Sequence, residues 1–308
     1  MAFIFAKPGQ AESASTGAAP HNGVWHPLSS IQRSFWFQYR LRPEMQGSSN
    51  LAFCIRVSGR LDLDRLSRAL NLLAARHPML RARFREIDGE PEQCIEPMAE
   101  VPIEVFDARG LDDPSVQKWV AGDYARPFDL TSAPLMRAKV YRQDDGQHVL
   151  LLVFDHLICD GWSFWRLIEE LGEILEGSGA SFVPDPPVEQ SGYFDYVREQ
   201  REWLSSAKAQ KQLAYWSETL RDECPVLNLP EAKSWSLRQF SQRETIPFVL
   251  PAELASNVKS LAGGHRCSVY MVLLAAYFAL LHRLTGEEHI SVGSLMPARG
   301  GGRWECVP

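Results

Sequence analysis

The chain has 308 residues, of which 45% are hydrophobic, so it can bury a substantial core, and its length suggests about two domains. Its net charge of −6 comes without a block of lysine or arginine, which argues against the basic surface that nucleic acid requires. The six cysteines form no C-x-x-C pair and follow no secretory signal, so we expect a reducing, cytoplasmic environment.

Residues 1–22 are small and polar without a hydrophobic period, so we expect a disordered lead-in there. After it, apolar residues recur with the period of helices or of strands, and capping or turn residues separate the segments. The predicted segments are a helix that opens over 28–36 with Ser29 or Ser30 as its N-cap, a strand over 51–57, a helix from Asp62 to His77, a strand over 80–84 and a strand over 136–141.

Residues 149–154 are continuously apolar, as expected of a strand that is covered on both faces. After this strand, Ser163 is the expected N-cap of a helix whose apolar positions recur at three and four. Two acids, a histidine and a glycine lie between the two elements, within residues 155–161. They therefore stand where the chain leaves the core, held rigidly and open to a substrate.

A linker rich in glycine, serine and proline, residues 177–187, indicates a boundary between a first region, 23–180, and a second region, 181–308. The apolar segment 269–281 is shorter than the ~20 residues of a membrane span, which predicts a core helix rather than a membrane anchor. The elements expected in the second region are a long helix over 192–220, a strand over 245–250, a helix over 252–261, the core helix over 269–284 and a strand over 289–293.

His156 is the strongest candidate for chemistry, because a histidine at the end of a strand can exchange protons near neutral pH. Asp160-Gly161 alone is ordinary turn chemistry. His148 and His156 have no third ligand in view, and the glycines at 300–302 lead into no helix. We therefore predict neither a metal site nor a nucleotide site.

Five segments share the residues of known motifs and occur in the right order. They match S-x-A-Q-x-R-x-W at 28–36, R-H-x-x-L-R-x-x-F at 76–84, H-H-x-x-x-D-G at 155–161, Y-x-D-Y at 193–196 and I-G-x-P-x-A-G-R at 292–299. On these motifs the chain resembles the condensation domains of nonribosomal peptide synthetases, which belong to the chloramphenicol-acetyltransferase-like superfamily.

The resemblance implies an α/β fold, an α+β sandwich of the chloramphenicol-acetyltransferase type, in which two lobes form a V around the active site. It also implies a complete N-terminal lobe over 23–180 and an incomplete C-terminal lobe over 181–308, since the later motifs of the family have no counterpart in the sequence. We therefore expect a C-terminally truncated member of the family.

The activity implied is acyl transfer in secondary metabolism: a carrier-bound acyl or peptidyl thioester is joined to an acceptor amine. The implied partners are the donor and acceptor carrier proteins, which hold the substrates on phosphopantetheine, and other synthetase modules. No directly bound cofactor, nucleic acid or membrane is expected.

Two residues inherit catalytic roles from the resemblance. His156 would be a general base or a hydrogen-bonding positioner for the amine, and the backbone N–H near Gly161 an oxyanion partner. Asp155 and Asp160 would be structural, with Asp160 paired to an arginine. We expect this partner to be Arg299, which also counts as structural at the active site; the alternatives are Arg81 and Arg33.

Asp155 stands where the family has its first histidine, and it leaves the subtype open. Asp155, Asp160 and Ser163 also fit the D-x-x-x-x-D-x-x-S signature of heterocyclisation domains, although those usually lack the histidine that is kept here. The alternatives are thus a heterocyclisation-type or ester-forming acyltransferase, or an inactive truncated remnant that docks carrier proteins.

Overall fold

The computed structural model describes residues 23–177, 192–221, 227, 229 and 248–294. The predicted lead-in 1–22, most of the linker and Arg299 lie outside these residues. The strands that the structure describes form two sheets. The larger sheet has the order β2-β7-β6-β5, with β2 Leu51–Ser58, β7 Gln147–Phe154, β6 Met136–Arg142 and β5 Ile103–Asp107. The smaller has the order β1-β4-β3, with β1 His26–Pro27, β4 Glu90–Ile95 and β3 Ala82–Ile87.

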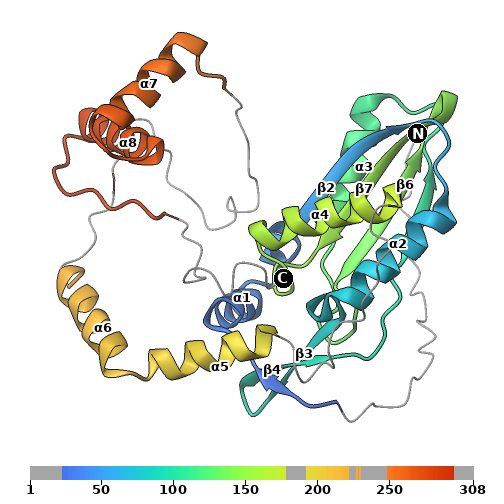
Figure 1. The fold of residues 1–308 in the computed structure, drawn as a ribbon, viewed down its shortest axis with the longest axis horizontal. Helices are drawn as coiled ribbons and strands as arrows, with labels where there is room; N and C mark the ends of the chain where they lie inside the picture. The colour runs from blue at the N-terminus through green and yellow to red at the C-terminus, as the bar shows by residue number, and fades with distance from the viewer. Residues whose placement is uncertain (1–22, 178–191, 222–226, 228, 230–247, 295–308) are drawn as a thin grey trace, which may run out of the picture.

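Strand β7 is the centre of the larger sheet, as its apolar run predicts. It pairs antiparallel with β2 on one side and β6 on the other, so that Phe154 lies opposite both Leu51 and Met136. Helices α2 (Leu63–Arg76) and α4 (Gly161–Glu176) cover one face of the sheet, and α3 (Asp113–Tyr124) covers the other (Figure 1). The resulting sandwich buries β7 on both faces.

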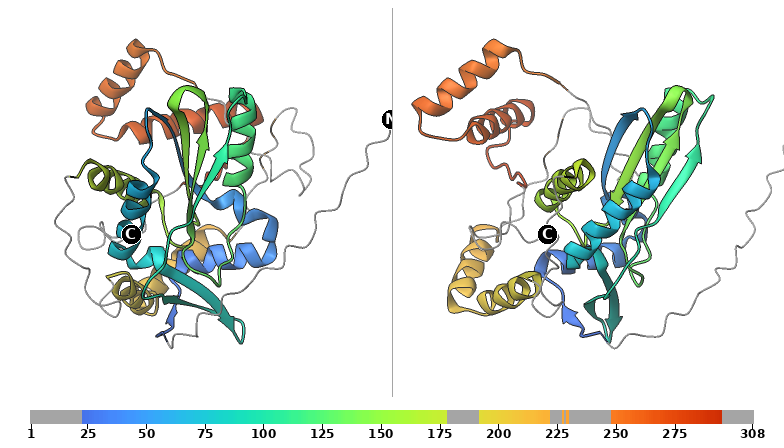
Figure 2. Two further views of the ribbon diagram at one scale, coloured as in Figure 1. Left: turned by 90° about the vertical axis from the view of Figure 1, so that its right-hand side faces the viewer. Right: turned by 45° about the vertical axis from the view of Figure 1, so that its right-hand side comes forward.

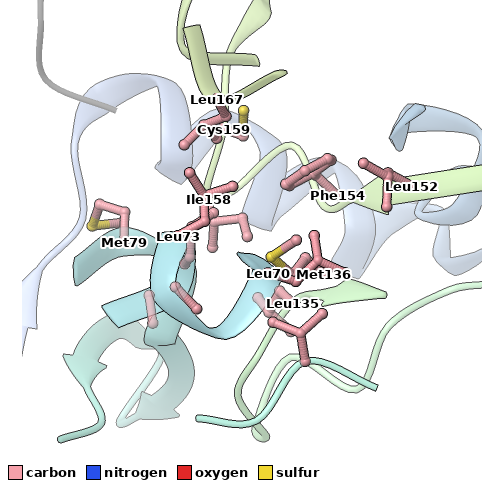
Figure 3. Close-up of a cluster of buried hydrophobic side chains, with 14 of the residues drawn as sticks. Leu70, Leu73, Met79, Leu135, Met136, Leu152, Phe154, Ile158, Cys159 and Leu167 are labelled. Atoms are coloured by element: carbon pink, nitrogen blue, oxygen red, sulfur yellow. The ribbon is translucent and has the colours of Figure 1, made fainter. Parts of the chain in front are cut away.

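The main core lies between the sheet and the helices α2 and α4, and it continues into the turn that follows β7. In Figure 3, Leu70 of α2 and Phe154 of β7 lie in the same cluster as Ile158 and Cys159 of the turn. Both turn residues are buried. The turn that carries the candidate chemistry is therefore anchored in the core by its apolar side chains.

Helix α1 (Ser30–Leu41) begins as expected, with Ser29 as its N-cap. Ser29 and Gln32 form a capping box, in which each side chain bonds the backbone N–H of the other. Short 3-10 helices join other elements, at Pro43–Met45, Gly47–Ser49, Pro78–Arg81 and Asp144–Gly146. The third of these displaces the predicted strand 80–84, so β3 starts only at Ala82.

The predicted helix over 192–220 is two helices, α5 (Gly192–Leu204) and α6 (Ala207–Thr219). The break lies at Ser205 and Ser206, because the Ser206 hydroxyl accepts a hydrogen bond from the Ala209 N–H at 3.2 Å and caps a new helix. Helix α5 packs beside β1, where Phe194 stacks on His26 with ring centroids 3.8 Å apart, and beside the start of α1, where the Ser30 N–H donates to Gln200.

Helices α7 (Ala252–Gly264) and α8 (Val269–Thr285) confirm two predicted helices, but the environment predicted for the second is wrong. Leu281 is the one residue of α8 that is buried, and Tyr270 and Met271 are more than half exposed. In the right-hand view of Figure 2, as in Figure 1, both helices lie apart from the two sheets. Within the described residues α8 is therefore not a core helix.

Two predicted strands of the second region are not found. Residues 248–250 and 289–293 are in no strand, while 245–247 lie outside the described residues. A strand exists only when a neighbouring strand pairs with its backbone. The sheets of the described chain take their strands from residues 26–154, so the described residues of the two segments belong to no sheet. No single described helix is long and apolar enough to cross a membrane. Only α7 and α8 together, bent by 106°, have sufficient length and composition.

Candidate functional site

The turn after β7 directs one side chain out of the core. The Asp155 N–H donates to the Leu135 carbonyl at 2.9 Å, and the Ile158 N–H donates to the Asp155 carbonyl at 3.2 Å. Leu157, like Ile158 and Cys159 after it, is buried. His156 is half-buried, so among residues 155–159 it alone reaches the surface of the lobe.

The His156 imidazole lies against the Phe35 ring of α1, with centroids 4.4 Å apart and an interplanar angle of 24°. Burial lowers the pKa of His156 below its ordinary value, and the carbonyls of His156 and Cys159 and the charge of Asp160 oppose this shift. Its Nδ1 atom is buried and makes no hydrogen bond within the described part of the chain. At neutral pH the ring is therefore uncharged and able to accept a proton.

Asp160, and not Ser163, is the N-cap of α4. One carboxylate oxygen, Oδ1, accepts hydrogen bonds from the N–H and from the hydroxyl of Ser163, each at 2.8 Å. Both residue types can cap a helix, but Ser163 sits at the third helical position, where it serves as the donor. Helix α4 therefore begins earlier than predicted and includes Gly161 and Trp162.

Gly161 is the first residue of α4, so its N–H belongs to the set that has no partner inside the helix. A Cβ atom placed at Gly161 would meet no other atom within 4 Å. The side of the chain where a side chain would stand is therefore open at the start of α4, so a substrate can come close to the backbone there.

Asp155 is fully buried, with an exposed fraction of 0%. Its Oδ1 accepts a hydrogen bond from the Leu157 N–H at 2.9 Å and so shapes the turn. Burial raises the pKa of Asp155 to about 6, although the Leu157 N–H, Gln46, Tyr39 and the charge of Arg137 all act to lower it. Asp155 thus braces the turn from inside the core.

Two of the three arginines predicted as partners of Asp160 have other contacts. Arg33 forms an ion pair with Glu90 at 2.6 Å. Arg81 donates from Nε to the Ala74 carbonyl at 3.0 Å and from Nη1 to the Pro97 carbonyl at 2.9 Å. Arg299 lies outside the described residues, so the arginine partner of Asp160 stays a prediction.

The sequence did not single out Gln32 and Gln93 for the site, yet the structure places their amides directly behind it. The Gln32 Nε2 donates to the carbonyl of Leu157, the residue after His156, at 2.9 Å. The only signal in the sequence is the place of Gln32 in the first motif. Among the described residues no three histidine, cysteine or acidic side chains are placed to hold a metal ion.

Comparison with known proteins gives a match to the family model described as "Condensation domain" over residues 25–305. The chain is 33% identical over 283 residues to bacitracin synthase 2 of Bacillus licheniformis, covering 92% of this chain and 10% of that protein. It is 33% identical over 281 residues to malpibaldin synthetase of Mortierella alpina, covering 89% of this chain and 5% of that protein. The chain thus spans a tenth or less of the length of these relatives.

Solved structures show the same fold. The first condensation domain of the calcium-dependent antibiotic synthetase, in complex with a substrate analogue, matches with a TM-score of 0.70 and 23% identity over 92% of this chain and 67% of that one. A four-domain nonribosomal peptide synthetase bound to AMP and glycine matches with a TM-score of 0.76 and 23% identity, over 89% of this chain and 20% of that one. The predicted fold class, a chloramphenicol-acetyltransferase-like α+β sandwich, is confirmed.

Proposed function

The chain belongs to the condensation-domain family, and on that premise we propose that it joins a carrier-bound acyl or peptidyl thioester to an acceptor amine. In this reaction a C–N bond forms and the C–S bond to the donor carrier breaks. The amine loses a proton and the departing thiolate gains one. The product is an amide, still held on the acceptor carrier.

The observation that carries the proposal is the environment of His156. It lies on the turn after β7, against Phe35, with its pKa lowered by burial. An α-amine titrates at about 7.7–8.0, so a useful fraction of it is already neutral at cellular pH. The principal role of His156 is then to hold the amine and to take the proton from the ammonium that forms when nitrogen attacks.

Other parts of the site follow from the same proposal. The N–H of Gly161 stabilises the oxyanion of the tetrahedral intermediate. Asp160 caps α4 and pairs with Arg299. Residues 23–180 form the N-terminal lobe, and residues 181–308 the linker and part of the second lobe. Donor and acceptor carrier proteins deliver the substrates on phosphopantetheine, and further synthetase modules supply and consume them.

The test is a reaction between purified partners. The 308-residue protein is incubated with donor carrier proteins loaded with aminoacyl or peptidyl groups and with loaded acceptor carriers, and the carriers are analysed by mass spectrometry. We expect the condensed thioester on the acceptor carrier. A product that has lost one further water would indicate heterocyclisation, and an ester would indicate an alcohol acceptor. Binding of both carriers without any product would leave only a docking role.

Replacement of Gly161 by alanine separates the oxyanion role from folding. Because the added methyl group meets no atom within 4 Å, we expect the free energy of unfolding to change by no more than about 1 kcal/mol. The methyl group would hinder the close approach of the substrate to the start of α4, so we expect the condensation rate to fall by about tenfold or more. Urea denaturation and the carrier assay measure the two effects. An unchanged rate would remove Gly161 from the mechanism.

A further inference from the structure

Two buried glutamines form a closed hydrogen-bonded pair behind His156. The exposed fraction of Gln32 is 3% and that of Gln93 is 0%. The Gln32 Nε2 donates to the Gln93 Oε1 at 2.9 Å, and the Gln93 Nε2 donates back to the Gln32 Oε1 at 3.1 Å. Each amide has one more N–H, which goes to the Leu157 carbonyl from Gln32 and to the Pro27 carbonyl, at 3.0 Å, from Gln93.

The orientation of both amides is fixed by their partners. The carbonyls of Leu157 and Pro27 can only accept, so each must face an NH₂ group. The Ser29 N–H can only donate, and it points at the Gln32 Oε1 at 3.0 Å. All four amide hydrogens and both amide oxygens are thereby satisfied. The pair connects β1, β4 and α1 to a turn that lies 125 residues further along the chain than Gln32.

Helix α1 therefore holds the His156 turn at two points. Gln32 donates to the backbone carbonyl of Leu157, the residue after His156. Phe35, three residues later on the same face of the helix, stacks on the imidazole itself. From within the turn, the Asp155 carboxylate holds the same residue by its N–H. A shift of the Leu157 carbonyl would move the imidazole relative to Phe35 and to the start of α4.

We propose that Gln32, held in place by Gln93, is a positioning residue that fixes the His156 imidazole for acyl transfer. Neither glutamine touches the substrate. The proposal rests on the function proposed above, in which His156 meets the amine. An imidazole displaced by a fraction of an ångström loses the geometry of the reaction, while the carriers still dock and the substrates still bind.

The test is the Gln32→Met variant of the full chain, which keeps the volume of the side chain but leaves the Leu157 carbonyl without its donor. Histidines are labelled with ¹³C, and His156→Gln identifies the His156 signal. We expect the NMR titration to show the pKa of His156 rising toward its ordinary value of 6.5, because a loosened ring becomes more hydrated. We expect kcat to fall about 10- to 100-fold and KM for the carriers to stay unchanged.

Two further variants complete the design. Gln200→Met is the matched control, since Gln200 also bonds the start of α1, accepting from the Ser30 N–H at 2.8 Å, but does not touch the His156 turn. It should leave the His156 titration and kcat unchanged. Gln93→Met keeps the bond from Gln32 to Leu157 and removes its support, so it should shift both quantities in the same direction by less. If Gln32→Met does not fold, Gln93→Met is the variant that tests the proposal.

A wild-type titration of His156 in folded Gln32→Met, or in Gln93→Met where the first does not fold, would overturn the proposal. A rise in the KM for the carriers by the same factor as the fall in kcat would also overturn it, because a positioning residue does not contribute to carrier binding. If the wild-type protein forms no product, the proposed function fails. The NMR titration then still decides, without activity, whether the amide pair positions His156.

Discussion

The His156→Ala protein is expected to fold as the wild type does and to condense carrier-bound substrates about 10²- to 10⁴-fold more slowly, the usual contribution of a positioned acid–base group. His156 is half-buried on a surface turn that Leu157, Ile158 and Cys159 anchor, so its truncation removes little packing. The carrier assay gives the rate, and circular dichroism with thermal unfolding shows whether the fold is kept.

The pH dependence of the wild-type rate tests the same role of His156. Burial lowers the pKa of His156, so the imidazole stays neutral to below its ordinary value of 6.5. Protonation of the acceptor amine lowers the rate below about pH 8 in any case. We expect a further fall as pH drops through the lowered pKa of His156, because the protonated ring cannot accept the ammonium proton. His148→Gln is the control, because it replaces a histidine of β7 that has no part in the proposed chemistry. It should leave the pH dependence unchanged. A rate that His156→Ala leaves intact would show that His156 carries none of the chemistry.

Asp155→Asn is expected to make the free energy of unfolding less sensitive to pH, by about 2 kcal/mol between pH 4 and pH 7. The carboxyl is fully buried and its pKa is raised from 3.8 to about 6. The folded state therefore binds this proton more tightly than the unfolded state does. The stability that the group contributes is complete below pH 3.8 and is lost as pH rises through about 6.

Asparagine has no proton to lose and keeps the oxygen that accepts the Leu157 N–H, so the variant isolates the charge. Urea unfolding of both proteins at pH 4, 5 and 7 measures the effect. The wild type should lose stability relative to Asp155→Asn as pH rises. A difference between the two proteins that stays constant across this range would mean that Asp155 titrates at its ordinary pKa, and that Arg137 and its other neighbours offset its burial.

Much of the first region could be predicted because its signals are local. The apolar run 149–154 needs both faces covered whatever the neighbours are, and β7 is the buried central strand. Asp62 caps α2, and His77 ends it before proline. Strands β4 and β5 and helix α3 were not predicted. In β4 the alternation is weak, since Gln93 is as buried as any apolar residue of the strand.

The errors came where the outcome depends on partners distant in the chain. Residues 289–293 have the composition of a strand but no strand beside them among the described residues. The N-cap of α4 is a local exception: Ser163 and Asp160 both suit this position, and the helix begins early enough for Asp160 to hold it. The apolar helix α8 predicted burial, yet burial requires a second surface to pack against it.

For the site, the residues that carry chemistry can be read from the amino-acid order alone. A histidine, two acids and a glycine after a buried strand, with four more motifs, were enough to identify the family and to single out His156. How that histidine is held depends on the folded chain. Its contacts with Phe35, and those of its turn with Gln32, cross more than a hundred residues, and such contacts depend on how α1 packs on the turn after β7. No local sequence pattern predicts that packing.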